Sequence, residues 1–156
     1  MALIKRYEDL NAWQRAYEVA LEINRLTNES SFDKKWAIKD QMLRSSLSIS
    51  SNIAEGFGRK SKKDFARFLL IAMGSNDELR NQLRFSFDTK LITEEDFESL
   101  NEKLIEVRKM THGLRKYLLN GKQWAVNSDQ YSVLSDQYSV LSEQYSVWNR
   151  LKNELI

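Results

Sequence analysis

The sequence predicts an all-α protein, with an antiparallel up-and-down four-helix bundle over residues 1–121 and a C-terminal heptad-repeat tail over residues 122–156. Its 156 residues include no proline and only five glycines, a composition expected for helices joined by short turns. Four stretches place apolar residues three and four positions apart, the spacing that lines side chains along one helix face. Amphipathic helices with short connections pack as antiparallel neighbours, which predicts the bundle.

The first predicted helix, from about Lys5 to Thr27, carries two apolar stripes. They consist of Leu10, Trp13, Tyr17 and Ala20 on one side, and of Ala12, Ala16, Val19, Ile23 and Leu26 on the other. A helix that is apolar over so much of its circumference is usually buried on more than one side. We therefore expect a second subunit to cover the part of this helix that the core leaves outside.

The second predicted helix follows a polar turn from Asn28 to Phe32 and runs to about Glu55, with Ser31 or Asp33 as its expected cap. Its inward face is predicted to contain Ile38, Met42, Ser45, Ile49 and Ile53. The serines along this helix are small, so a neighbouring helix can approach closely. Because serine is a mediocre helix former, tertiary packing must stabilise this helix.

The third predicted helix follows a glycine-rich turn. Gly56 and Gly58 are expected to end the second helix, because glycine tolerates the left-handed conformation that closes a last turn. Ser61 followed by Asp64 has the spacing of a capping box and predicts the next helix start. The predicted core face of this helix consists of Phe65, Phe68, Leu69, Ala72, Leu79 and Leu83, and Leu70, Ile71 and Met73 widen its apolar surface.

The fourth predicted helix starts at a second capping box, formed by Thr93 and Asp96. Its apolar seam consists of Phe97, Leu100, Leu104, Val107, Thr111, Leu114 and Leu118. These residues are spaced as heptads, and Asn120 and Gly121 are expected to end the helix.

Beyond Ser128 the chain repeats the heptad SDQYSVL almost without change. If the repeats are helical, their a/d stripe consists of Tyr131, Leu134, Tyr138, Leu141, Tyr145 and Trp148. Serine, aspartate and valine are weak helix formers, and three heptads alone make a marginal helix. We interpret the tail as an appendage of the bundle, either loosely ordered or a helix that needs a partner.

The turn between the second and third predicted helices is strongly basic, although the whole chain has a formal net charge of only +2. Its cations are Arg59, Lys60, Lys62, Lys63 and Arg67, named the basic corner below, and Asp64 is the single anion among them. They flank a helix N-terminus, where free N–H groups and the helix dipole also favour an anion. A phosphate backbone is the expected partner, and a merely solvated surface is the other interpretation.

Catalytic and metal sites find little support in the sequence. The single histidine, His112, cannot supply the Glu-x-x-His pairs of a di-iron bundle, and no nucleophile motif accompanies it. The segment around Gly56 lacks the spacing and the preceding strand of a phosphate loop, and a chain without cysteine has no thiolate zinc site. For Asn52 and Glu55, near the turn, we expect structural hydrogen bonds. We predict no catalytic residue, no metal and no cofactor.

Membrane insertion is not expected either. The longest apolar run, Phe68 to Met73, has six residues, whereas a membrane span needs roughly 20. The N-terminal residues MALIKRYEDL carry charges where a signal peptide needs an apolar run. We therefore expect a soluble, cytoplasmic protein.

Residues 45–79 carry a specific family pattern. Its matching residues are Ser48, Ile49, Asn52 to Gly56, Arg59, Phe65, Phe68, Leu69, Ala72, Gly74, Ser75, Glu78 and Leu79, with Leu10, Trp13, Gln41 and Arg44 upstream. Over roughly residues 5–120 the chain resembles the four-helix bundle family of proteins encoded in intervening sequences of bacterial 23S ribosomal RNA genes. That family includes the accessory variability determinant of diversity-generating retroelements. The chain lacks the proline that the family often has near Phe32, and the tail has no counterpart.

The resemblance implies a homopentameric barrel of four-helix bundles. In the retroelement branch it also implies binding to RNA or DNA and to a reverse transcriptase. Carried over by position, the implied nucleic-acid contacts are Arg44, Arg59, Arg80 and Arg84. Our interpretation is a non-enzymatic, homo-oligomeric, nucleic-acid-binding bundle. The alternative is a structural or protein-interaction oligomer that does not bind nucleic acid.

Truncation after Gly121 tests the predicted boundary between bundle and tail. Removing residues 122–156 is expected to shift the Tm of the bundle by less than about 4 °C, because the tail contributes little to its core. Circular dichroism during heating measures the shift. A larger drop in Tm contradicts the boundary.

Overall fold

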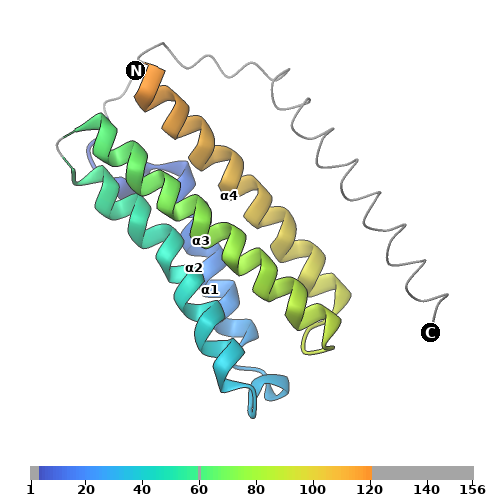
Figure 1. The fold of residues 1–156 in the computed structure, drawn as a ribbon. Helices are drawn as coiled ribbons and strands as arrows, with labels where there is room; N and C mark the ends of the chain where they lie inside the picture. Colours follow the sequence, from blue (N-terminus) through green and yellow to red (C-terminus); the bar gives the residue numbers. More distant parts are fainter. Residues whose placement is uncertain (1–3, 60, 121–156) are drawn as a thin grey trace. The chain divides into compact units, whose positions relative to one another are not determined.

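The computed structural model describes residues 4–59 and 61–120. Within these ranges there are four α-helices and no strand, which confirms the predicted all-α bundle (Figure 1). The helices are α1 (Asn11–Leu26), α2 (Trp36–Phe57), α3 (Lys62–Asp88) and α4 (Glu94–Asn120), with short 3-10 helices η1 (Tyr7–Asp9) and η2 (Ser30–Phe32). The predicted heptad tail lies outside the described residues, as does Lys60 of the basic corner.

The four helices close into one antiparallel bundle. Each helix packs against the next in sequence, and α1 also packs against α4. The bundle therefore has two ends (Figure 1). One, the corner end, contains η1, the α2–α3 turn and the C-terminus of α4. The other, the far end, contains the α1–α2 and α3–α4 connections.

The core consists of the helix faces that periodicity predicts. Its fully buried side chains include Val19, Ile23, Met42, Ile49, Ile53, Leu69, Leu79, Leu83, Leu104 and Val107. Side chains toward the ends of the predicted faces, such as Ile38, Phe97 and Leu118, are partly buried and pack against this cluster. Burying a large aliphatic side chain contributes about 1.5–3 kcal/mol. Hydrophobic burial along all four helices therefore stabilises the bundle.

The first two helices start later than predicted. Residues before Asn11 form η1, and Leu10 has an extended backbone, so α1 does not reach back to Lys5. Ser31 and Asp33 do not cap α2, because η2 intervenes and α2 begins at Trp36 without a side-chain cap. The physical reason is Phe32, whose side chain is fully buried in the core and fixes this segment as a short 3-10 turn.

Both predicted helix starts are confirmed, each with the first of the two hydrogen bonds of a capping box. The backbone N–H of Asp64 donates to Oγ of Ser61 at 3.0 Å, and the Ser61 hydroxyl donates to the Asp64 carboxylate at 2.6 Å. Thr93 and Asp96 repeat this geometry at 3.1 and 2.6 Å. The starts of α3 and α4 are thus set by side chains three residues apart.

The left-handed conformation predicted for Gly56 and Gly58 is wrong. Gly58 follows α2 with a φ of −70°, which any residue adopts, and Gly56 lies inside the helix. Gly56 is needed for space. A Cβ atom there would lie 2.6 Å from Cδ2 of Phe65 and 2.7 Å from Cβ of Phe68. The missing side chain lets α3 approach the backbone of α2.

Gly56→Ala is expected to destabilise the bundle by about 1–3 kcal/mol, because the added methyl group forces α2 and α3 apart. The matched control is Gly74→Ala in the middle of α3, where an added Cβ meets nothing within 4 Å. The control should be neutral or stabilising by up to about 1 kcal/mol, since alanine favours helix more than glycine. Urea unfolding of both variants measures the difference. Equal effects would contradict the close-approach role.

Candidate nucleic-acid interface

The described part of the basic corner lies at the α2–α3 turn. Arg59 follows the end of α2, Lys62 and Lys63 begin α3, and Arg67 lies just over one helical turn farther on. All four side chains are exposed. The Gly56 contact and the Ser61 cap hold the backbone on both sides of the turn, so these charges project from a fixed frame.

Two of the corner guanidinium groups lie against the same aromatic ring. The guanidinium carbons of Arg59 and Arg67 lie 4.8 and 5.3 Å from the centre of the Phe68 ring. Arg59 also pairs with Glu55 one turn earlier on α2. Exposed ion pairs of this kind contribute less than about 1 kcal/mol. Glu55 thus orients Arg59 while offsetting only part of the positive charge of the corner.

Asn52 bonds a serine of α2 that itself bonds α3. Its side-chain amide donates to the backbone oxygen of Ser48 at 2.7 Å and to the Ser48 hydroxyl at 3.1 Å. The Ser48 hydroxyl in turn shares a hydrogen bond of 2.8 Å with Ser75 on α3. Nearby, Ser45 donates to Gln82 of α3 at 2.6 Å. These bonds support the structural role expected for Asn52, although Asn52 bonds within α2, to a serine that bonds α3, and not in the turn.

The start of α3 adds backbone donors to the side-chain cations. The first N–H groups of a helix have no acceptor within it, and the helix dipole places a partial positive charge there. Lys62 and Lys63 occupy these first positions of α3. An anion such as a phosphate would therefore meet both ammonium groups and backbone donors at this site.

The other three predicted contacts lie away from the corner. Counting along α3, Arg80 and Arg84 are about 27 and 33 Å from Lys62. Arg44 is exposed on α2, where its nearest carboxylate oxygen, on Asp40, lies at 3.8 Å. The seven predicted contact residues that the structure describes therefore do not form one surface within a single subunit.

Arg80 and Arg84 contact α3–α4 neighbours. Nε of Arg80 donates to the side-chain oxygen of Asn101 at 3.1 Å. Arg84 binds both carboxylate oxygens of Asp88 at 2.9 Å and lies over the rings of Phe87 and Phe97. Its side chain is only 18% exposed. Arg84 thus has a structural role at the end of α3.

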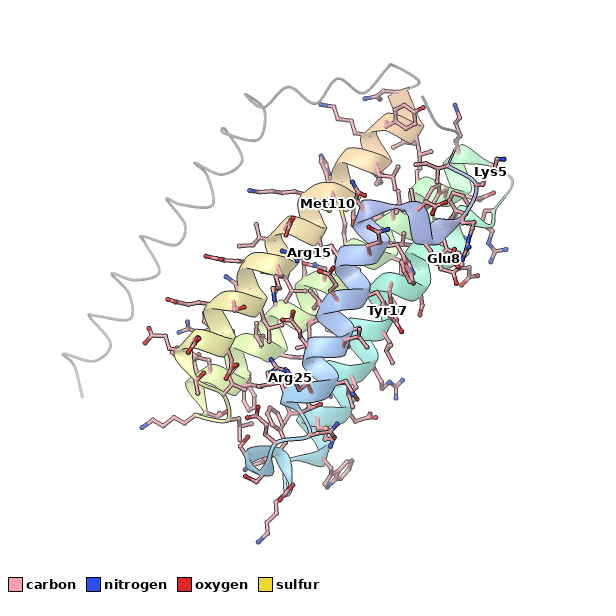
Figure 2. The ribbon with its side chains drawn as sticks, turned by 180° about the vertical axis from the view of Figure 1, so that it is seen from behind. Lys5, Glu8, Arg15, Tyr17, Arg25 and Met110 are labelled. Atoms are coloured by element: carbon pink, nitrogen blue, oxygen red, sulfur yellow. The ribbon has the colours of Figure 1, made fainter. Side chains whose placement is uncertain are left out.

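Sequence reasoning missed cations that the fold brings to the corner end. The last turns of α4 contain Arg115 and Lys116, and the segment before α1 contains Lys5 and Arg6. Figure 2 shows Lys5 and Glu8 at the end where α2 and α3 join, and Arg25 toward the other end. The signal was available in the topology, because an up-and-down bundle brings its N-terminus, its middle turn and its C-terminus to the same end.

The carboxylate of Glu8 adds an anion to the corner end. Arg6 donates to it at 2.8 Å, and this hydrogen bond, with the coulombic attraction of the guanidinium, lowers the pKa of Glu8. Glu8 therefore stays ionised and offsets Arg6. Along α1, Arg15 donates hydrogen bonds to Glu18 and Glu106, and these carboxylates raise the pKa of Arg15 above its ordinary value.

The same residues offer little to other kinds of ligand. Among the described residues, no group of three or more histidine, cysteine, aspartate or glutamate side chains could hold a metal ion. His112 is exposed. An open groove along the first turns of α4 is lined by Thr93, Glu94, Glu95, Glu98, Ser99 and Glu102, and its charge opposes anionic ligands.

Within residues 4–59 and 61–120, no helix is long and apolar enough to cross a membrane.

Comparisons with known proteins agree with the resemblance seen in the sequence. A family model described as "23S rRNA-intervening sequence protein" matches residues 8–113. A crystal structure of a protein of unknown function from the S23 ribosomal protein family of Bacteroides thetaiotaomicron is similar to this chain, with a TM-score of 0.62 and 31% sequence identity. The similarity covers 67% of this chain and 98% of that chain. A search of curated proteins finds no match.

The matched segment spans α1, α2, α3 and most of α4, and therefore includes the Gly56 contact and the basic corner. The chain belongs to the family of 23S rRNA-intervening sequence proteins.

Proposed function

We propose that this protein is a non-enzymatic, homo-oligomeric bundle that binds RNA or DNA through its basic corner. The observation that carries the proposal is the fixed array of exposed cations at the α2–α3 turn. Lys62, Lys63 and Arg67 have no ion-pair partner within residues 4–59 and 61–120. Cations that keep their full charge release counterions when they meet phosphates, and this release drives binding to nucleic acid.

Self-association is proposed because an apolar face remains on α1 and α2. This apolar face consists of Trp13, Tyr17, Leu21, Leu43 and Leu47. Tyr17, Leu21 and Leu47 are 42%, 54% and 51% exposed, and the rings of Trp13 and Tyr17 stack with centres 4.9 Å apart. Contiguous exposed apolar side chains mark interaction surfaces.

Helices α1 and α2 present the side chains of the apolar face on the sides where the two helices adjoin. Arg15 binds Glu106 of α4 at 2.6 Å, and Tyr17 is two residues away, about 200° around the helix, so it lies on the α2 side of α1. Figure 2 shows Arg15 and Tyr17 on opposite sides of α1. By the same rotation, Leu47 lies opposite Ser45, which bonds α3, and therefore on the α1 side of α2. One partner surface can cover both.

Assembly strengthens the nucleic-acid proposal. Each subunit added to a ring repeats the basic corner, and weak contacts of linked sites add through multivalency. The family resemblance makes five the proposed number of subunits and a reverse transcriptase a proposed protein partner, in the cytoplasm. The neighbouring structure's family name refers to ribosomal proteins, which directs the first binding test to RNA.

Leu47→Glu is expected to dissociate the oligomer, because a buried, unpaired carboxylate at the subunit contact is costly. The matched control is Leu70→Glu, an equally exposed leucine on α3. Light scattering coupled to size exclusion measures the mass of each variant. We expect a multimer for the unmodified chain and for the control, and a smaller species for Leu47→Glu. A folded monomer of the unmodified chain would overturn the proposed assembly.

Charge reversal of the corner tests nucleic-acid binding. Replacing Arg59, Lys60, Lys62 and Lys63 by glutamate is expected to weaken binding to a labelled 30-nucleotide RNA by at least about 100-fold. The logarithm of the affinity of the unmodified protein should fall linearly with the logarithm of the salt concentration, because phosphate contacts release counterions. Shift assays at several salt concentrations measure both effects. Binding that is insensitive to salt or to the reversal refutes the proposal.

The second candidate is an oligomer that serves only as a structural or protein-interaction module. The observation in its favour is the apolar face itself, which needs a protein partner and no nucleic acid. It predicts a stable multimer with no affinity for RNA or DNA at moderate salt. The same shift assay with duplex DNA as a second probe separates the two candidates.

A further inference from the structure

The charges of α4 are separated along its length. Residues 94–106 contain six carboxylates and one cation, Lys103, whereas residues 107–120 contain four cations and no carboxylate. The carboxylates are Glu94, Glu95, Asp96, Glu98, Glu102 and Glu106, and the cations of the second half are Arg108, Lys109, Arg115 and Lys116. The acidic half starts at the far end of the bundle, and the basic half ends at the corner end (Figure 1).

The register between α3 and α4 places part of this basic half beside the corner. Arg108 pairs with Asp77 at 3.3 Å, so these two residues lie at similar heights. Arg67 precedes Asp77 by ten residues, which is about 15 Å along α3. Arg115 and Lys116 follow Arg108 by seven and eight residues, which is about 11 Å along α4. Arg67 therefore lies within about 5 Å of the height of Arg115 and Lys116 on the adjacent antiparallel helix, and Lys62 and Lys63 lie about 10 Å farther toward the α2–α3 turn.

Arg115 lacks a partner that would explain its position. Its side chain is half-buried, and its buried Nε has no hydrogen-bond partner among the residues that the structure describes. An unsatisfied buried donor is costly, more so on a charged group. Arg108 and Arg15 lie on the same bundle, and both are paired with carboxylates. No carboxylate among the described residues holds Arg115, so its side chain is available to turn toward a phosphate oxygen, which would supply an acceptor.

We propose that the basic half of α4 is a second wall of the nucleic-acid interface, in which Arg115 and Lys116 bind backbone phosphates beside Arg67 and extend the surface that Lys62 and Lys63 begin. This inference rests on the proposed nucleic-acid-binding function and extends its surface from the α2–α3 turn onto α4. The acidic half of the same helix repels phosphates. Nucleic acid is therefore confined to the corner end of each subunit, and a ring of subunits would present these ends together.

The test compares two double variants with equal changes of net charge. Arg115→Gln with Lys116→Gln removes two cations at the corner end, and Arg25→Gln with Lys34→Gln removes two exposed cations toward the far end. The probes are a labelled 30-nucleotide single-stranded RNA and a 30-base-pair DNA duplex, at several salt concentrations. The first variant should bind at least about tenfold more weakly and lower the salt slope by about 1.4 to 1.8, the value for two phosphate contacts. The control should change affinity less than about threefold.

Two further measurements distinguish phosphate binding by Arg115 and Lys116 from a structural role of these residues. Arg115→Lys keeps the charge and should keep most of the affinity. Cations near a helix C-terminus also interact favourably with the helix dipole, and loss of that interaction lowers the unfolding free energy without changing the salt slope. Urea unfolding of each variant therefore accompanies the binding assay. A lower unfolding free energy with an unchanged salt slope overturns the proposal.

The outcomes distinguish this inference from the proposed function. If reversal of the basic corner abolishes binding while Arg115→Gln with Lys116→Gln binds like its control, the second wall is refuted and the corner remains the interface. If the unmodified protein binds neither probe, both proposals fail. If the corner reversal and Arg115→Gln with Lys116→Gln both lower the affinity and the salt slope, the result supports one continuous surface.

Discussion

The close approach of α3 to α2 at Gly56 is the constraint on which the corner depends. Because Gly56 has no Cβ, Phe65 and Phe68 pack directly against the α2 backbone. The ring of Phe68 then lies beneath the guanidinium groups of Arg59 and Arg67. The same contact that closes the hydrophobic core at this end therefore sets where the exposed charges stand. The Gly56 contact therefore determines both the packing at this end and the positions of the charges in the proposed interface.

Small polar side chains extend this close packing along the rest of the α2–α3 interface. The Ser48–Ser75 and Ser45–Gln82 hydrogen bonds join the two helices at successive levels. Buried hydroxyl and amide groups need specific partners, so they fix the register of the two helices more strictly than aliphatic contacts do. The short α2–α3 turn fixes which ends of the two helices meet, and these hydrogen bonds fix how far the helices are shifted along each other.

The small net charge of the chain conceals a strong separation of charge. Carboxylates concentrate on the first half of α4, and cations gather on its second half and at the α2–α3 turn. Antiparallel packing brings the two cationic segments together, although more than forty residues separate them in sequence. A polyanion therefore meets a bundle with one attractive end, and orientation follows from electrostatics without any base-specific contact.

The sequence alone determined the features that depend on neighbours within one or two helical turns. The apolar faces of all four helices, including Met42 to Ile53 and Leu100 to Thr111, follow from periodicity, and the Ser61 and Thr93 caps follow from a three-residue spacing. The family pattern around Asn52 to Gly56 also identified the family.

Only the tertiary structure decided the features that depend on residues distant in sequence. The space requirement of Gly56 comes from two phenylalanines on the next helix, and the burial of Phe32 moved the start of α2. Arg84 looked like a surface contact, yet it lies against Asp88 and two aromatic rings from separate helices. The position of Arg115 beside Arg67 likewise required the α3–α4 register. Local pattern sets each helix and its faces, whereas packing between helices decides which faces and which charges meet.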